Sequence, residues 1–150
     1  MAVEQATIRQ DVFAALSALL IANKPSYTYN GTVYEYDIVA EYNRKNPTFP
    51  VIVLNKARIT FPIITLDGET GDVEIEVDME FYAKELHGKV AIDAGMDSAM
   101  NTIINNISTF IGTNKLIPQE DFWTDSGNSV FQDENQVLNT ATSTARFKLG

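Results

Sequence analysis

The chain has 150 residues, no cysteine and a formal net charge of −9, from 20 acidic and 11 basic residues with the single histidine neutral. A hydrophobic content of 45% at this length predicts one globular domain spanning residues 1–150 and excludes a disordered chain. Without cysteine there are no disulfides, thiolate metal ligands or cysteine nucleophiles, and the acidic balance disfavours binding to a phosphate backbone or to an anionic membrane surface.

The first predicted element is an amphipathic helix over residues 4–23. Its apolar face consists of residues that recur every three or four positions, among them Ile8, Val12, Leu16 and Leu19. Pro25 ends the helix, because the residue before a proline is driven out of the α region. The most apolar part, residues 12–22, is too short to span a bilayer and no basic segment precedes it, so neither a membrane anchor nor a leader is predicted.

A β-hairpin is predicted next, around Asn30 and Gly31. A type I′ turn needs positive φ at both central positions, and this pair meets that need between two runs rich in Thr and Tyr. The second strand is expected to continue to about residue 39. Residues 41–50 then form a loop, because the prolines in it cannot donate to a strand ladder.

The same region supplies the candidate interface residues. Tyrosines crowd the first strands, and two interpretations stay open: an interaction surface, or simple β-propensity at half-buried positions. The loop adds two adjacent bases and is held by its prolines. The interface candidates are Tyr34, Tyr36, Arg44, Lys45, Pro47 and Phe49.

Two apolar runs, residues 51–54 and 58–66, precede the most informative stretch of the sequence. The first predicts a strand buried on both faces, and Pro62 places the second at an edge or a bulge. Acidic and apolar residues then alternate from residue 72 to residue 81, which is typical of a strand with one face in a core and the other in solvent. The predicted inward residues are Val73, Ile75, Val77, Met79 and Phe81, and the outward residues, the acidic row, are Asp72, Glu74, Glu76, Asp78 and Glu80.

The negative charge is concentrated in this part of the sequence. Residues 67–85, which begin with a turn at residues 67–71, hold eight acids and one base and so carry −7 of the net −9. Like charges on one strand face repel each other, and the bases expected nearby are limited to Arg44, Lys45, Lys56 and Arg58. A sheet that tolerates such a row is expected to use a negative surface.

A second helix is predicted over residues 86–111, with Gly112 at its C-terminal cap. Its apolar stripe begins at Val90 and includes Ile104, while Gly88 and Gly95 each weaken the helix by about 1 kcal/mol. Residues 113–150 are expected to be polar and turn-rich up to about residue 135 and to end in a strand over residues 136–149. This order predicts an α+β fold, in which two helices pack on one face of a mainly antiparallel sheet.

Patterns for catalysis or metal binding are weak. A Ser-His-Asp site would need His87, the only histidine, for which a solvated or capping role is the more usual one. An EF-hand fails in residues 67–78, because Asp72 and Asp78 replace the required glycine and glutamate. No metal or cofactor site is predicted, and the alternative from a different class is a carboxylate-based enzyme or ion-binding module that uses the acidic row.

As a whole, the chain resembles the tail terminator (tail completion) proteins of long-tailed phages and similar archaeal viruses. Four features carry the resemblance, and together they cover nearly the whole chain. They are the N-terminal amphipathic helix, the alternating strand that runs directly into a long helix, the C-terminal strand region, and the Tyr-rich strand and loop that lead to Phe49-Pro50-Val51-Ile52-Val53.

The resemblance implies a structural virion protein without catalysis or cofactor. Such proteins form a homohexameric ring that caps the tail tube, stops its polymerisation and offers a surface to the head-completion, or connector, protein. Their place is the head-proximal end of the tail, after assembly in the host cytoplasm. In that family the sheet tends to line the lumen, so six acidic rows would place roughly thirty carboxylates around a channel through which DNA passes without specific binding. The alternative within this class is another neck or tail-tube subunit.

Overall fold

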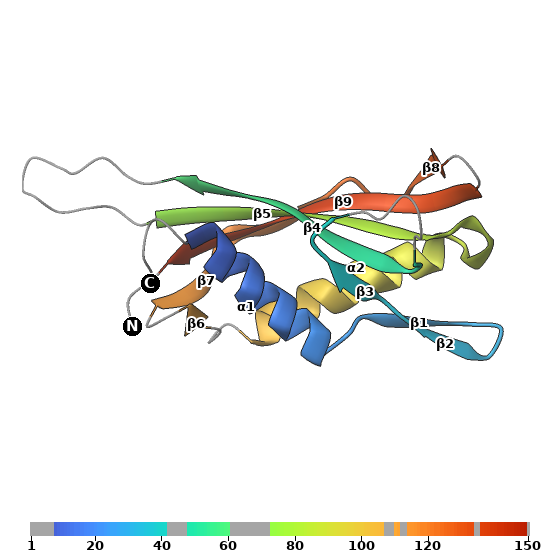
Figure 1. Ribbon diagram of the computed structural model, residues 1–150, viewed down its shortest axis with the longest axis horizontal. Helices are drawn as coiled ribbons and strands as arrows, with labels where there is room; N and C mark the ends of the chain where they lie inside the picture. The colour runs from blue at the N-terminus through green and yellow to red at the C-terminus, as the bar shows by residue number, and fades with distance from the viewer. Residues whose placement is uncertain are drawn as a thin grey trace, which may run out of the picture.

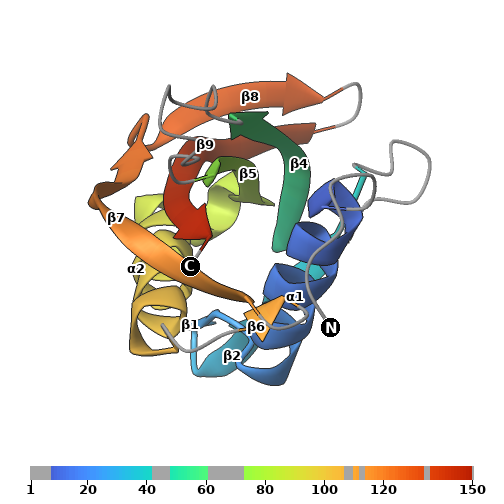
Figure 2. The same ribbon diagram turned by 90° about the vertical axis from the view of Figure 1, so that its left-hand side faces the viewer.

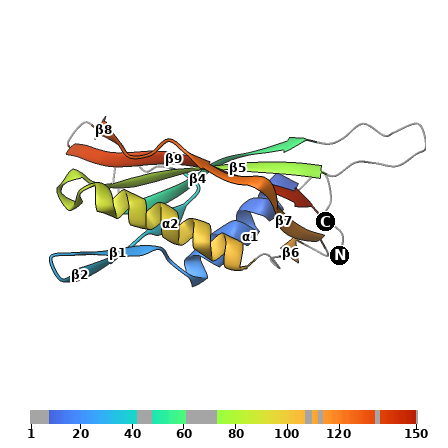
Figure 3. The same ribbon diagram turned by 180° about the vertical axis from the view of Figure 1, so that it is seen from behind.

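The structure, a computed structural model, describes residues 8–41, 48–60, 73–106, 110–111, 114–133 and 136–149. In these residues, two helices and a small hairpin lie on one face of a larger, mainly antiparallel sheet (Figure 1, Figure 3). Seen from the end, the sheet arches over both helices (Figure 2). The predicted α+β fold with two helices on one face of the sheet is therefore confirmed.

The main sheet has the strand order β3-β4-β5-β9-β7-β6, and β8 also pairs with β9. Of the described strand pairs, β3 with β4 is the parallel one and the others are antiparallel. The elements are α1 (Ile8–Ala22), β1 (Ser26–Tyr29), β2 (Thr32–Glu35), β3 (Asp37–Val39), β4 (Val51–Thr60), β5 (Val73–Lys84), the 3₁₀ turn η1 (Glu85–His87), α2 (Lys89–Asn105), β6 (Phe110–Ile111), β7 (Asn114–Asp125), β8 (Ser129–Asp133) and β9 (Gln136–Leu149).

The hairpin β1–β2 is a separate two-stranded sheet. Asn30 and Gly31 at its turn have φ of 49° and 77°, as the type I′ prediction requires. The expectation of one strand up to residue 39 was wrong. The strand is interrupted at Tyr36, whose backbone N–H donates to the Pro25 carbonyl at 2.8 Å. After this residue, β3 joins the main sheet beside β4.

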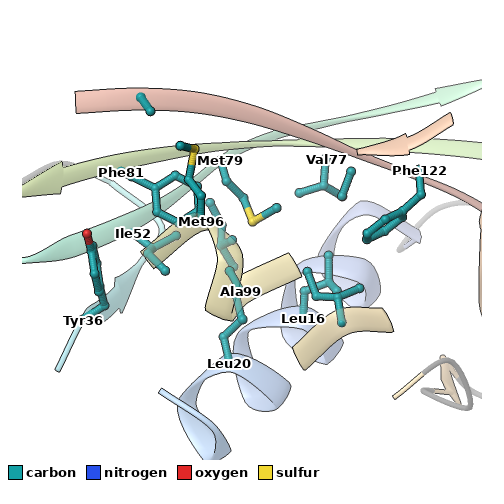
Figure 4. Packing of buried hydrophobic residues seen from close by; sticks show 14 of the residues in the cluster. Leu16, Leu20, Tyr36, Ile52, Val77, Met79, Phe81, Met96, Ala99 and Phe122 are labelled. Atoms are coloured by element: carbon teal, nitrogen blue, oxygen red, sulfur yellow. The ribbon is translucent and has the colours of Figure 1, made fainter. Parts of the chain in front are cut away.

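The core lies between the sheet and the helices (Figure 4). Ile75, Val77, Met79 and Phe81 of β5 are fully buried in this core, as the alternating pattern predicted. Burying side chains of this size contributes about 1.5–3 kcal/mol each. The predicted strand at residues 51–54 is buried on both faces as expected, and it continues through a bulge after Leu54 to Thr60.

The second helix differs from its prediction. It begins at Lys89 after the 3₁₀ turn and ends at Asn105, while residues 107–109 and 112–113 lie outside the described residues. Val90 is 69% exposed and Ile104 is 42% exposed, so the predicted apolar stripe was wrong at both positions. The buried face of the helix consists of Ala91, Ile92, Gly95, Met96, Ala99 and Ile103, and Tyr36 packs directly against it at Gly95.

The C-terminal region was only partly predicted. The strand at residues 136–149 is confirmed as β9, but the expected turn-rich stretch before it contains β7 and β8. The polar composition of β7 concealed it, and its pairing with β9 is interrupted between Pro118 and Trp123. No helix in the described part of the chain is long and apolar enough to cross a membrane.

Candidate functional site

The first candidate site is the face of the main sheet that none of the described helices covers, which we call the open face (Figure 1, Figure 3). Glu74, Glu76, Asp78 and Glu80 lie on this face, since their neighbours along β5 point into the core. Asp72, the fifth member of the predicted acidic row, lies outside the described residues, as do Pro62 and the turn predicted at residues 67–71.

The open face does not carry a single sign of charge. On β4, Lys56 lies opposite Asp78 and Arg58 lies opposite Glu76. On the other side of β5, the strand β9 places Arg146 opposite Glu76 and a lysine opposite Glu74. The four described acids of β5 are therefore flanked by four bases on the two neighbouring strands. The expectation that only residues 44, 45, 56 and 58 could supply bases was wrong.

Arg58 makes the closest contacts of this network. Its Nη2 donates to Glu76 Oε2 at 2.7 Å and to Asp78 Oδ1 at 3.1 Å, and its Nη1 donates to Asp78 Oδ2. Thr144 on β9 donates to the same Asp78 carboxylate at 2.8 Å. The hydrogen bonds that Arg58 donates, first to Asp78 and then to Glu76, raise the pKa of Arg58 above its usual value. Because these side chains are partly exposed, each pair contributes less than about 1 kcal/mol of stability.

Arg146 extends the network across β9 to β7. Its Nε lies 4.0 Å from Glu76 Oε1 and 3.8 Å from Asp121 Oδ2. Its Nη1 donates to Thr124 Oγ1 at 3.1 Å and to the Asp121 carbonyl at 3.3 Å. Four neighbouring strands are therefore tied together by ion pairs in which each arginine is shared by more than one acceptor.

An open hollow of about 280 Å³ lies on this face between β4, β5 and β9. Its charged members are already engaged, since Asp78 is bound by Arg58 and Glu80 accepts a hydrogen bond from Tyr82 at 3.0 Å. Among the residues that the structure describes, no group of three or more His, Asp or Glu side chains is placed to hold a metal ion. The other polar residues around the hollow are Asn55, Thr142, Ser143 and Thr144.

A second cluster lies on the helix side of the sheet and consists of Tyr27, Tyr29, Tyr34 and His87, which we call the His87 cluster. The Tyr27 hydroxyl lies 2.6 Å from His87 Nδ1. The His87 ring stacks on Tyr29 with a centroid distance of 4.4 Å and is tilted against Tyr34 at 4.5 Å. Burial, together with Tyr34, raises the pKa of Tyr27 to about 12. Burial first, and then the charge of Lys84, lowers the pKa of His87.

The structure describes three of the six predicted interface residues. Tyr34 belongs to the His87 cluster. Tyr36 is fully buried and its hydroxyl donates to the Ala91 carbonyl at 2.6 Å, so it is a core residue and not a surface one. Phe49 is half-buried before a cis bond to Pro50. Arg44, Lys45 and Pro47, like Tyr42, fall outside the described residues.

Sequence reasoning missed both arginine pairing across β9 and the surroundings of His87. Arg146 is 70 residues from Glu76 along the chain. The period-two pattern of β9 could have placed Arg146 on the outward face of its strand, but not beside Glu76. His87 was expected to be solvated or capping, but three tyrosines of the hairpin surround it.

No protein-family model matches this chain, and no curated protein is significantly similar to it.

Proposed function

We propose that the protein is a tail terminator of a long-tailed phage or a similar tailed virus. It forms a homohexameric ring on the finished tail tube, ends polymerisation of the tube and joins the tail to the head connector. The support is the combination of element order and layers. An amphipathic helix, a Tyr-rich hairpin, an alternating strand that leads into a second helix and a C-terminal strand all belong to one small α+β domain.

The observation that carries the proposal is the open face. The described helices lie on one side of the sheet (Figure 2), and the charged side chains of β4, β5 and β9 lie on the other. This arrangement suits a subunit that turns its charged face toward a channel and its helices outward. The open face consists of regular, mostly long strands, so copies placed side by side would give a continuous wall.

The charges on that face change how DNA would pass. A purely acidic wall would repel phosphates, but Arg58 and Arg146 lie among the acids. Binding to duplex DNA gains most from free cations that replace condensed counterions. Because Glu76 and Asp78 already bind these arginines, a phosphate would have to break ion pairs to reach them. The arginines of this face are therefore masked rather than absent: the acids that neutralise Arg58 and Arg146 keep both from binding phosphate freely.

The alternative of an ion-binding module receives no support from these contacts. A hard cation needs several free carboxylate oxygens at one place, whereas Asp78 binds Arg58 through both oxygens and Thr144 through one of them. Glu80 is likewise engaged by Tyr82.

Light scattering of the purified chain, with and without purified tail tubes, tests the proposal. A hexamer, either alone or on tubes, is expected, and added chain should stop further tube growth. A chain that stays monomeric, ignores tubes and melts at a higher temperature with calcium would contradict the terminator and favour the ion binder.

A further inference from the structure

The β1–β2 hairpin is attached to the domain by side chains and not by strand pairing. It is not paired with any described strand of the main sheet, and β1 packs against α2, with Tyr27 in the core (Figure 1). Its two faces differ. The outer face consists of Ser26, Thr28, Val33 and Glu35, all exposed, and the inner face presents Tyr27, Tyr29 and Tyr34.

The three inner tyrosines meet at one side chain. His87, in the 3₁₀ turn before α2, bonds to Tyr27, stacks on Tyr29 and contacts Tyr34. The turn itself is held by β9, since the Asn139 amide lies 3.4 Å from the carbonyls of Lys84 and Glu85. The 3₁₀ turn on which the hairpin packs is therefore fixed to the main sheet, and the contact between the hairpin and this turn centres on the His87 imidazole.

We propose that His87 is a proton-sensitive latch: its neutral ring holds the hairpin against the start of α2, and protonation of the ring releases the hairpin while the main sheet stays folded. The sole histidine of the chain thereby sets the position of a projecting arm. This inference does not depend on the proposed function.

The chemistry of the contact favours the neutral ring. A neutral imidazole with its proton on Nε2 accepts the Tyr27 hydroxyl at Nδ1. Protonation would place a donor on Nδ1, turn the hydroxyl around and create a positive charge on a half-buried ring near Lys84. Around His87, the hairpin carries the titratable groups Tyr27, Tyr29, Tyr34 and Glu35, the end of β5 carries Lys84, the turn itself carries Glu85, and the first turns of α2 carry Lys89 and Asp93. The nearby Asn139 of β9 does not titrate.

The direction of the pH effect follows from the lowered pKa of His87. When the closed state has the lower pKa, the open state binds the proton more readily, so closing is weakened as pH falls. Docking is complete above the ordinary histidine pKa of about 6.5 and is lost progressively below it.

Nuclear magnetic resonance tests the latch on the whole chain. The ring protons of the single histidine report its titration, and amide hydrogen exchange, corrected for the intrinsic rate, reports protection of β1, β2 and β9. We expect the midpoint of His87 to lie below the ordinary value. Hairpin amides should lose protection as His87 protonates, while amides of β9 keep theirs.

Three variants separate the latch from general packing. His87→Phe keeps a ring but cannot be protonated, so hairpin protection should become independent of pH. Tyr27→Phe removes the hydroxyl that favours the neutral ring, so the midpoint of His87 should rise. Tyr82→Phe, whose hydroxyl bonds to Glu80 on the open face, is the matched control and should leave the midpoint unchanged.

Two results would overturn the proposal. One is hairpin protection that does not change while His87 titrates in the unmodified chain. The other is the same loss of protection at low pH in His87→Phe. Should that variant not fold, the unmodified chain and Tyr27→Phe still decide the question.

Discussion

At the scale of single residues, Gly95 shows how a local rule can hide a packing requirement. In the middle of a helix, glycine costs about 1 kcal/mol relative to alanine. Here a Cβ at position 95 would lie 2.5 Å from Tyr36 Cζ, which is closer than real contacts allow. Tyr36 cannot retreat easily, because it is fully buried and bonded to the Ala91 carbonyl. The glycine is thus needed for the approach of Tyr36, which a pattern confined to the helix could not reveal.

Gly95→Ala is therefore expected to destabilise the protein although alanine favours helix. Overpacking of a tight core costs about 1–3 kcal/mol, which exceeds the gain in helix propensity. Denaturant unfolding should show a lower midpoint at an unchanged slope. Ser98→Ala, at a half-buried position of the same helix, is the control. A Gly95→Ala variant as stable as the native chain would show that Tyr36 is free to move.

Masking of the arginines makes a prediction about DNA. Glu76→Gln with Asp78→Asn removes the two negative charges that neutralise Arg58 and should give the chain measurable affinity for duplex DNA, decreasing steeply with salt. Fluorescence anisotropy at low salt measures this gain. Asp93→Asn with Asp97→Asn removes the same charge from α2 and should leave the chain without affinity. Equal affinity of both double variants would mean that net charge alone matters.

At the scale of elements, the sequence predicted which face of β5 each side chain takes, but not which strands lie beside β5. The alternation in β5 placed its inward residues correctly, because the pleat of a strand determines which face each side chain takes. The charge of the same face depends on β9, whose Arg146 comes from the far end of the chain. Counting charges along the sequence correctly located the acids on β5. It could not show that the pairing of β5 with β9 brings Arg146 and a lysine beside these acids.

The hairpin turn was predicted correctly because its requirement is local. Gly31 has a φ of 77°, and a Cβ there would meet no other atom, so the cost of a side chain is purely conformational. Gly31→Val should lose about 1–2 kcal/mol at this turn. Hydrogen exchange should locate the loss in β1 and β2 and leave β9 protected. Thr32→Val, at an exposed strand position, is the control, and equal exchange in both variants would contradict this reading of the turn.

At the scale of the whole molecule, the layered fold was predictable because helices with one apolar face and a strand with one apolar face have few ways to bury both. The extent of β7 was not, since its residues carry no clear alternation and its pairing with β9 is broken after Pro118. The arrangement leaves one face of the sheet uncovered by the described helices and places the hairpin β1–β2 outside the main sheet (Figure 1).

The most direct test of the proposed function is the position of the chain in particles of the tailed virus that the proposal requires. Electron cryo-microscopy of intact virions should locate six copies in one ring at the head-proximal end of the tail, with the open face toward the channel. Copies repeated along the tail, copies in the head, or particles that lack the chain would contradict the account.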